Sequence, residues 1–97
     1  MLFLIRFTDK PDTFALRQRL LPAHIAWLAE RRDTVLVAGS LRADASAAPI
    51  GGAWAVEVDS RATAETVYLT DPFWVHGLRE SVEIMVWSKA LPERALV

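Results

Sequence analysis

The chain contains no cysteine among its 97 residues. A disulfide framework, a cysteine-based metal site and a thiol redox centre are therefore excluded. An excess of either charge is also missing, because 11 Lys and Arg residues stand against 12 Asp and Glu residues and leave a net charge of −1. The basic face that nucleic-acid binding needs is not expected.

Long apolar runs are absent too, since none approaches the roughly 18 residues that a membrane-spanning helix requires. The N-terminal stretch MLFLIRFTDK has no basic leader and is followed by no small-residue cleavage pattern, so no signal peptide is expected. The cytoplasm is therefore the predicted location, without a membrane partner. The four glycines form neither G-x-G-x-x-G nor G-x-x-x-x-G-K, so we expect no cofactor of the nucleotide type, and no other cofactor is indicated.

Apolar residues are abundant, at 53% of the chain with four Trp and four Phe, which is enough for a hydrophobic core. The length suits one small domain. No repeat, low-complexity tract or linker interrupts the chain, so we predict a single domain over residues 1–97. Its core would cover residues 1–87, and residues 88–97, which include Pro92, would form a C-terminal arm.

Six helices and strands are predicted. Apolar residues recur at helical spacing over residues 13–32, and Pro22 should kink this helix or divide it, which would place His24 in the first turn of a second piece. Ser60 is a suitable N-cap for another helix over residues 61–69, which the following Asp-Pro pair would end. Segments rich in β-forming residues are the predicted strands: 2–7, 35–38, 53–58 and 82–87. The predicted connections are a turn at 9–12, a loop at 43–52 and a tight aromatic stretch at 73–78.

The resulting order, β-α-β-β-α-β, is that of the ferredoxin-like plait, an α+β fold with a four-stranded antiparallel sheet and helices on one face. The face without helices should alternate apolar and polar residues. The predicted strands are instead apolar at both parities, as in residues 2–5 (L-F-L-I) and 53–56 (A-W-A-V). Because so apolar a sheet face needs a cover, we predict a homodimer in which the sheets of two copies pack together.

Five segments carry a resemblance to a known family: residues 22–28 (P-A-H-I-A-W-L), 36–41 (L-V-A-G-S-L), 50–52 (I-G-G), 71–78 (D-P-F-W-V-H-G-L) and 82–87 (V-E-I-M-V-W). In these segments the chain resembles the YciI-like, or YCII-related, domain family, and the likeness runs from residue 1 to about residue 87. The resemblance implies a dimeric α+β barrel. It also implies a cleft in which a His and an Asp, here His24 and Asp71, act as a pair.

Relatives in that family include a dehydrochlorinase of chlorinated hydroxyquinol breakdown, and the wider fold includes muconolactone isomerases. Three positions depart from the family pattern. Leu21 stands where many members have Arg, Ser40 where Pro is frequent, and His76 where a small residue is common. The missing Arg removes one means of holding an anionic substrate.

His24 and Asp71 are the candidate catalytic residues. A carboxylate that binds one imidazole nitrogen fixes the tautomer, leaves the other nitrogen as a base and stabilises the imidazolium. His24 would carry a proton and Asp71 would orient it. The alternative for His24 is a structural histidine satisfied by a backbone carbonyl, and for Asp71 a residue that ends a helix before Pro72.

Five further residues are candidate substrate-binding groups. Arg17 could hold a carboxylate or phenolate, and Ser40 could donate a hydrogen bond where a strand ends. Phe73 and Trp74 could wall the cleft, and His76 could line it. The alternatives are a solvated helix face for Arg17 and a surface position for His76. Two His and a carboxylate also form a known metal set, but no His spacing supports one here, so no metal is expected.

These residues favour a small, cofactor-independent enzyme, of the isomerase, lyase or dehalogenase kind, that acts on a cyclic organic acid or phenol. The alternative is a non-catalytic homodimer that binds a small molecule or assists a larger enzyme. A third hypothesis, a heme- or oxygen-handling monooxygenase, comes from fold analogy alone. The residues themselves leave open whether the chain is an enzyme.

Overall fold

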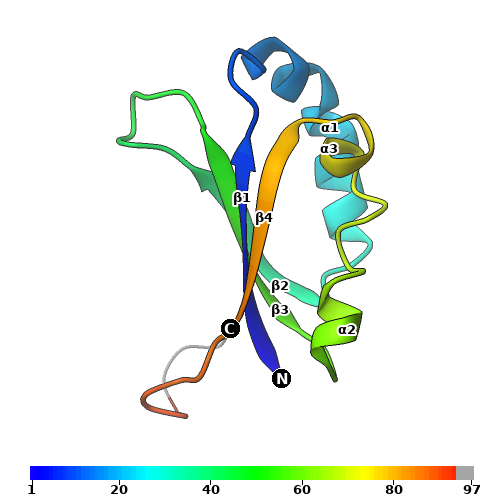
Figure 1. Ribbon diagram of the computed structural model, residues 1–97, viewed down its shortest axis with the longest axis vertical. Coiled ribbons are helices and arrows are strands. Elements are labelled where there is room, and N and C mark those ends of the chain that lie inside the picture. The colour runs from blue at the N-terminus through cyan, green and yellow to red at the C-terminus, as the bar shows by residue number, and fades with distance from the viewer. Residues whose placement is uncertain (94–97) are drawn as a thin grey trace.

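Four strands and three helices make up the computed structural model, which describes residues 1–93. They follow in the order β1 (Leu2–Asp9), α1 (Phe14–Ala29), β2 (Val35–Leu41), β3 (Gly51–Glu57), α2 (Arg61–Ala64), α3 (Pro72–Val75) and β4 (Arg79–Val86). The strands form one antiparallel sheet in the order β2-β3-β1-β4, and all helices lie on one side of it (Figure 1). This arrangement is the ferredoxin-like plait, so the predicted fold class is confirmed.

The core lies between the sheet and the helices. Phe3, Ile5 and Phe7 alternate along β1 toward the helices, and each is at most 1% exposed. Ile5 is paired across the sheet with Trp54 on β3. Trp27 of α1 packs on Trp54 with ring centroids 5.6 Å apart. Because each such buried side chain contributes roughly 1.5–3 kcal/mol, these contacts fix α1 on the sheet.

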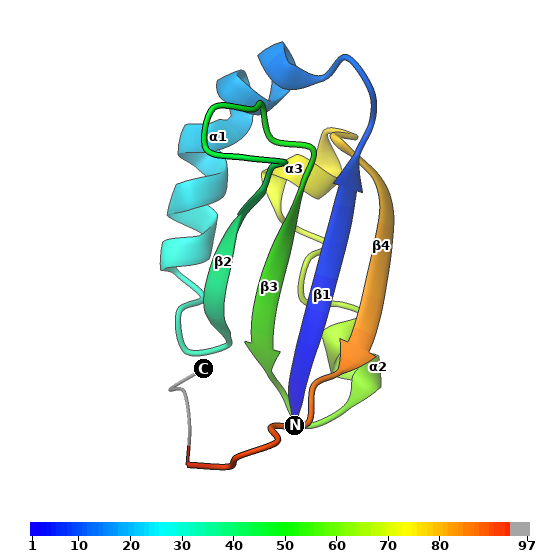
Figure 2. The same cartoon turned by 90° about the vertical axis from the view of Figure 1, so that its left-hand side faces the viewer.

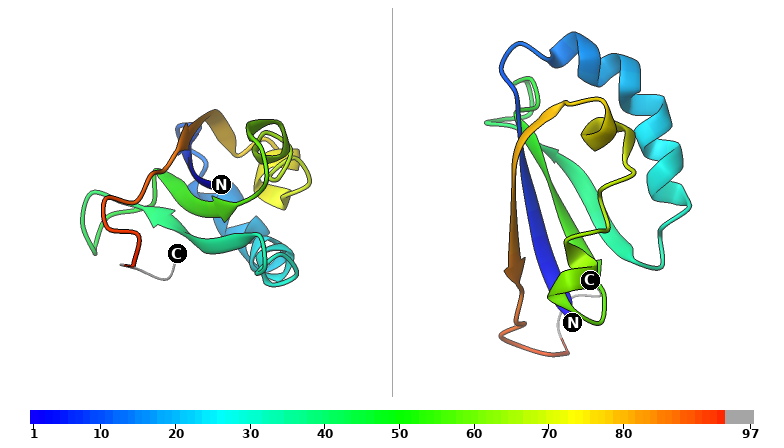
Figure 3. Two further views of the ribbon diagram at one scale, coloured as in Figure 1. Left: turned by 90° about the horizontal axis from the view of Figure 1, so that it is seen from below. Right: turned by 45° about the vertical axis from the view of Figure 1, so that its right-hand side comes forward.

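Helix α1 is continuous, so of the two effects predicted for Pro22, a kink or a division, the division does not occur. Pro22 is exposed, and water can replace the backbone hydrogen bond that proline cannot donate. The ribbon bends along α1 rather than breaking (Figure 3). Arg17, His24 and Trp27 are the buried residues of this helix, and His24 lies in its middle turns rather than in a first turn.

The predicted second helix is shorter than expected. Its N-cap is as predicted, because the Ser60 hydroxyl accepts a hydrogen bond from the Thr63 backbone N–H at 3.1 Å. However, α2 ends at Ala64, and turns follow over residues 65–70. Asp71 does not end a helix. It caps the N-terminus of the short α3, because the Asp-Pro pair that stops one helix also suits the first positions of the next.

The face of the sheet without helices is turned toward the viewer in Figure 2, and the strand pairing places an apolar row on this face across all four strands. Val37 is paired with Ala55, Ala55 with Leu4, and Leu4 with Met85. Val37 is 47% exposed and Met85 is 40% exposed in the single chain. The homodimer that would cover this row stays a prediction.

The segment after β4 has neither helix nor strand over residues 87–93. The remainder of the predicted C-terminal arm, residues 94–97, lies outside the described residues. Within residues 1–93, no helix combines the length and the apolar character that spanning a membrane would take.

Candidate active site

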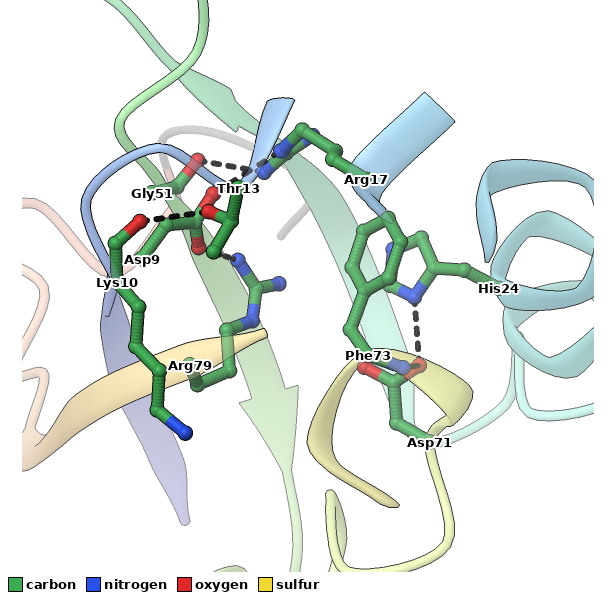
Figure 4. Close-up of polar contacts among 9 residues, drawn as sticks. All are labelled: Asp9, Lys10, Thr13, Arg17, His24, Gly51, Asp71, Phe73 and Arg79. Atoms are coloured by element: carbon green, nitrogen blue, oxygen red, sulfur yellow. Dashed lines mark hydrogen bonds and ion pairs between the residues drawn. The ribbon is translucent and has the colours of Figure 1, made fainter. Parts of the chain in front are cut away.

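His24 and Asp71 are in direct contact, although 47 residues separate them in sequence. His24 Nδ1 lies 2.7 Å from Asp71 Oδ1, and the side chains are 9% and 1% exposed (Figure 4). Since a carboxylate only accepts hydrogen bonds, the contact assigns the proton to Nδ1 and leaves Nε2 as the acceptor of the neutral imidazole. No described residue hydrogen-bonds to Nε2, which leaves this nitrogen available to a ligand.

The start of α3 holds the carboxylate in place. Asp71 Oδ1 also accepts the backbone N–H of Phe73 at 3.1 Å. Oδ2 is buried and has no hydrogen-bond partner among the described residues. The position of the carboxylate therefore depends on the α3 backbone and on the imidazole, and the cap and the His–Asp contact use the same oxygen.

The Phe73 ring is the surface on which the site is assembled. It stacks on the His24 ring with centroids 3.9 Å apart and planes 13° apart. The guanidinium carbons of Arg17 and Arg79 each lie 5.0 Å from the Phe73 centroid. A single side chain at the start of α3 therefore contacts the histidine and both arginines.

Asp9 joins these two arginines in a buried ion cluster (Figure 4). Asp9 accepts hydrogen bonds from Arg79 Nη1 at 2.7 Å and from Arg17 Nε at 3.0 Å. Arg17 Nη2 also donates to the Gly51 carbonyl at 3.0 Å. Burial lowers the pKa of Arg79 and the hydrogen bond to Asp9 opposes this, but a guanidinium stays charged near neutral pH. Two cations share one carboxylate, so the cluster has a net charge of +1.

A cavity of about 560 Å³ opens between α1, β2 and the loop before β3. Its polar lining comes from Arg17, His24, Ser40, Arg42 and Arg79, together with Gln18 and Ser46. Neither Asp nor Glu is among its lining residues, all of which lie in the described part of the chain. The other lining residues are apolar or glycine: Phe14, Leu21, Ile25, Leu28, Ala38, Gly39, Ala47, Ala48 and Pro49.

Five of the seven residues predicted from the sequence meet at this cavity. Arg17, His24 and Ser40 line it. Asp71 and Phe73 lie behind His24 and contact its ring. The predicted set therefore comes together from α1, β2 and the start of α3.

Trp74 and His76 are placed elsewhere. Trp74 packs edge-on against Tyr68 with centroids 4.6 Å apart, and His76 is an exposed residue at the end of α3. Neither is among the residues that line the cavity. Within residues 1–93, no group of three or more His, Asp or Glu side chains is arranged to hold a metal ion.

Sequence reasoning missed Arg79 and favoured a turn-forming role for Asp9. Strand β4 begins at Arg79, three residues before its predicted start, and places this side chain opposite Asp9 of β1. A charged residue shortly before the predicted strand was the available signal. Its partner could not be inferred, because 70 residues separate the two.

Comparison with solved structures identifies an enzyme of closely similar architecture. The 5-chloro-2-hydroxyhydroquinone dehydrochlorinase TftG from Burkholderia phenoliruptrix, in complex with 2,5-dihydroxybenzoquinone, matches with a TM-score of 0.82 and 25% identity. The match covers 91% of this chain and 94% of that one. This chain is thus similar over most of its length to an enzyme with a bound small molecule.

More distant matches show the fold alone. A Bacteroides thetaiotaomicron protein assigned as an antibiotic biosynthesis monooxygenase matches with a TM-score of 0.59 and 16% identity, over 100% of this chain and 95% of that one. A NIPSNAP family protein from Agrobacterium tumefaciens matches with a TM-score of 0.51 and 18% identity, over 96% and 97% of the two chains. No curated protein sequence matches the chain.

The sequence itself matches a family pattern over nearly its whole length. The YCII-related domain covers residues 1–88, which include both members of the His–Asp pair and all the residues of the cavity. The resemblance noted from the sequence motifs is therefore confirmed, and this chain belongs to the YCII-related domain family.

Proposed function

We propose that this protein is a small enzyme that uses no cofactor and moves a proton on a cyclic organic acid or phenol, in an isomerisation, an elimination or a dehalogenation. His24 carries the proton and Asp71 orients it. The observation that carries the proposal is the 2.7 Å contact between His24 Nδ1 and Asp71 Oδ1, made by a histidine that also lines the cavity.

In the proposed step, His24 Nε2 accepts a proton from the substrate. The electron pair left behind forms a new π bond. In an elimination or dehalogenation, the leaving group departs with the electron pair of the bond that breaks, and His24 then releases its proton to water. In an isomerisation, an existing π bond of the substrate breaks, its electron pair moves to a second substrate atom, and His24 returns the proton to that atom. The Asp71 carboxylate stabilises the imidazolium that forms between these events.

The size and lining of the cavity support a single-ring substrate. Its volume, about 560 Å³, falls within the range of roughly 300–1,000 Å³ typical of small-molecule sites. The Ser40 hydroxyl and the Arg17 guanidinium lie on its wall as hydrogen-bond donors. The similarity to a dehydrochlorinase with a bound dihydroxybenzoquinone favours hydroxylated and chlorinated rings as the first compounds to test.

The test is turnover by the wild type, His24→Ala and Asp71→Asn on a panel of lactones and chlorinated quinols. Both substitutions should lower turnover by about 10²–10⁴-fold, the usual range for a general acid–base group. His76→Ala is the matched control, because it removes an exposed imidazole that does not line the cavity. It should leave turnover unchanged.

Unchanged turnover in both His24→Ala and Asp71→Asn would remove the proton-transfer role. If the wild type turns over no compound on the panel but binds some of them, the outcome favours the alternative, a ligand-binding or accessory protein without catalysis. The circular dichroism spectra of the variants should match that of the wild type, so that loss of fold is not mistaken for loss of chemistry.

The same proposal includes a homodimer formed through the sheet face and a cytoplasmic location. The apolar row of Val37, Ala55, Leu4 and Met85 supports the dimer, since its two ends, Val37 and Met85, are exposed in the single chain and their contact with water is unfavourable. The location rests on composition alone, because a chain without cysteine suits a reducing compartment.

A further inference from the structure

We propose that Arg79 and Arg17 form an anion-binding subsite at the polar end of the cavity, and that the substrate binds there through an oxyanion attached to its ring, a phenolate or a carboxylate. The inference rests on the proposed function, because it concerns the same cavity. It adds a binding role for Arg79 and a charge state for the ligand, neither of which the His–Asp pair requires.

The first argument is the charge balance. Arg17 and Arg79 are both buried, and both pair with the single carboxylate of Asp9. The other buried carboxylate, Asp71, also acts on Arg79, but its hydrogen bonds are to His24 and to the Phe73 backbone rather than to an arginine. Arg42 adds another cation to the lining, and none of the described residues that line the cavity is acidic. Because a buried cation is costly unless it is paired, a lining with three arginines and no carboxylate favours a ligand with a negative charge.

The second argument is the unused hydrogen-bonding capacity of Arg79. A guanidinium has five N–H donors. The Arg79 side chain is 2% exposed, yet its one hydrogen bond to a described residue is the one from Nη1 to Asp9, and Nε is buried without a partner. In Figure 4 the other terminal nitrogen points away from Asp9, toward the space beside Phe73 and His24.

The third argument is the space that Gly52 leaves for the Arg79 guanidinium. Gly52 lies on the helix-facing side of β3, and a Cβ there would come within 3.3 Å of Arg79 Nη2 and 3.1 Å of the Gly39 carbonyl oxygen. The missing side chain thus leaves the guanidinium free beside the cavity. A larger residue at position 52 would crowd the donors that we assign to the anion.

The fourth argument is the spacing of the functional groups. Arg79 and His24 both contact the Phe73 ring, so an oxyanion at the arginine lies close to the base. The α1 side of the cavity adds apolar contacts from Leu21, Ile25 and Leu28 for the ring itself. One planar ring can therefore present its oxyanion to Arg79 and another of its atoms to His24 Nε2.

The probe is 4-nitrophenol, whose phenolate absorbs visible light whereas its phenol form does not. Wild-type protein is titrated with the probe across a range of pH. The phenolate should bind about tenfold more tightly than the phenol or better, which lowers the apparent pKa of the bound probe by about one unit. Neutral 4-nitroanisole should bind at least about tenfold more weakly, and 4-nitrobenzoate shows whether a carboxylate is preferred to a phenolate.

Arg79→Met should lower the affinity for either anion by about tenfold or more and leave that for 4-nitroanisole unchanged. Arg19→Met is the matched control, because it removes the same charge from an exposed position of α1 outside the cavity. If Arg79→Met does not fold, Gly52→Ala replaces it. It should weaken anion binding because its methyl group crowds Arg79 Nη2.

His24→Ala separates this inference from the proposed function. It should lower turnover by about 10²–10⁴-fold yet keep the preference for the anion. An unshifted probe pKa in the wild type, together with no preference for 4-nitrobenzoate over 4-nitroanisole, overturns the subsite even if turnover depends on His24. Failure of both anions to bind overturns it as well.

Discussion

Replacing Asp9 by Asn tests the buried ion cluster directly. The Asp9 side chain is 5% exposed and accepts hydrogen bonds from Arg79 Nη1 at 2.7 Å and Arg17 Nε at 3.0 Å. An asparagine keeps the shape but loses the charge, and its amide nitrogen faces one of the two donors instead of accepting from it. Two buried guanidinium groups would then lack a counter-charge.

Removing one member of a buried ion pair costs about 3–5 kcal/mol. A domain of this size has a total stability of about 5–15 kcal/mol, so Asp9→Asn should lose a large share of it. The measurement is urea unfolding followed by circular dichroism, at one fixed protein concentration because any dimer makes stability depend on concentration. Glu65→Gln is the control, since its ion pair with Arg61 is exposed and contributes about 0.3–0.5 kcal/mol.

Asp9→Asn should also respond more strongly to an anion than the wild type does. The variant has one more uncompensated positive charge beside the cavity, so it should bind 4-nitrobenzoate more tightly. A ligand at 100 times its dissociation constant stabilises the folded state by about 2.7 kcal/mol, enough to recover much of the loss. An Asp9→Asn variant within about 1 kcal/mol of the wild type in unfolding free energy would refute the reasoning.

Two other substitutions test the backbone and the uncovered sheet face. Gly51→Ala should destabilise the fold or prevent it, because its Cβ would overlap the Phe7 carbonyl oxygen, whereas Gly39→Ala, with no atom within 4 Å, should change the unfolding midpoint little; urea titration compares the two. Val37→Glu should convert the predicted homodimer to a monomer in analytical ultracentrifugation, because it places a charge in the apolar row beside Ala55; a wild type that is already monomeric at micromolar concentration contradicts the dimer.

The order of helices and strands along the chain was predictable, because local sequence patterns decide it. Runs of β-forming residues separated by turn residues predict the four strands, and two intervening helical patterns leave the plait as the simplest arrangement. The boundaries were less predictable. Strand β4 starts three residues early, at Arg79, because its polar beginning is stabilised by a partner in β1, and local pattern contains no information about that partner.

Residues of the candidate site were predictable only where they belong to a recognisable sequence motif. The P-A-H and D-P-F segments suggested His24 and Asp71 through the family resemblance, while Pro22 and the Asp-Pro pair misled the assignment of the helices around them. An exposed proline can be tolerated inside a helix when water takes over the missing hydrogen bond. An Asp-Pro pair suits both the end of one helix and the start of the next, so its role depends on the chain that follows.

The positions of the His–Asp pair and of the two arginines are coupled, because Phe73 contacts both groups. Its backbone N–H fixes Asp71 Oδ1, while its ring supports the His24 imidazole on one side and contacts both guanidinium groups. A shift of α3 would therefore disturb the contacts of the base and of the cations together. The guanidinium groups are also held by Asp9 and Gly51, so the rigid phenyl ring lies between groups that are each fixed from a second side. A site needs such fixed positions when it must hold an oxyanion and a reacting proton of the same ring at a constant separation.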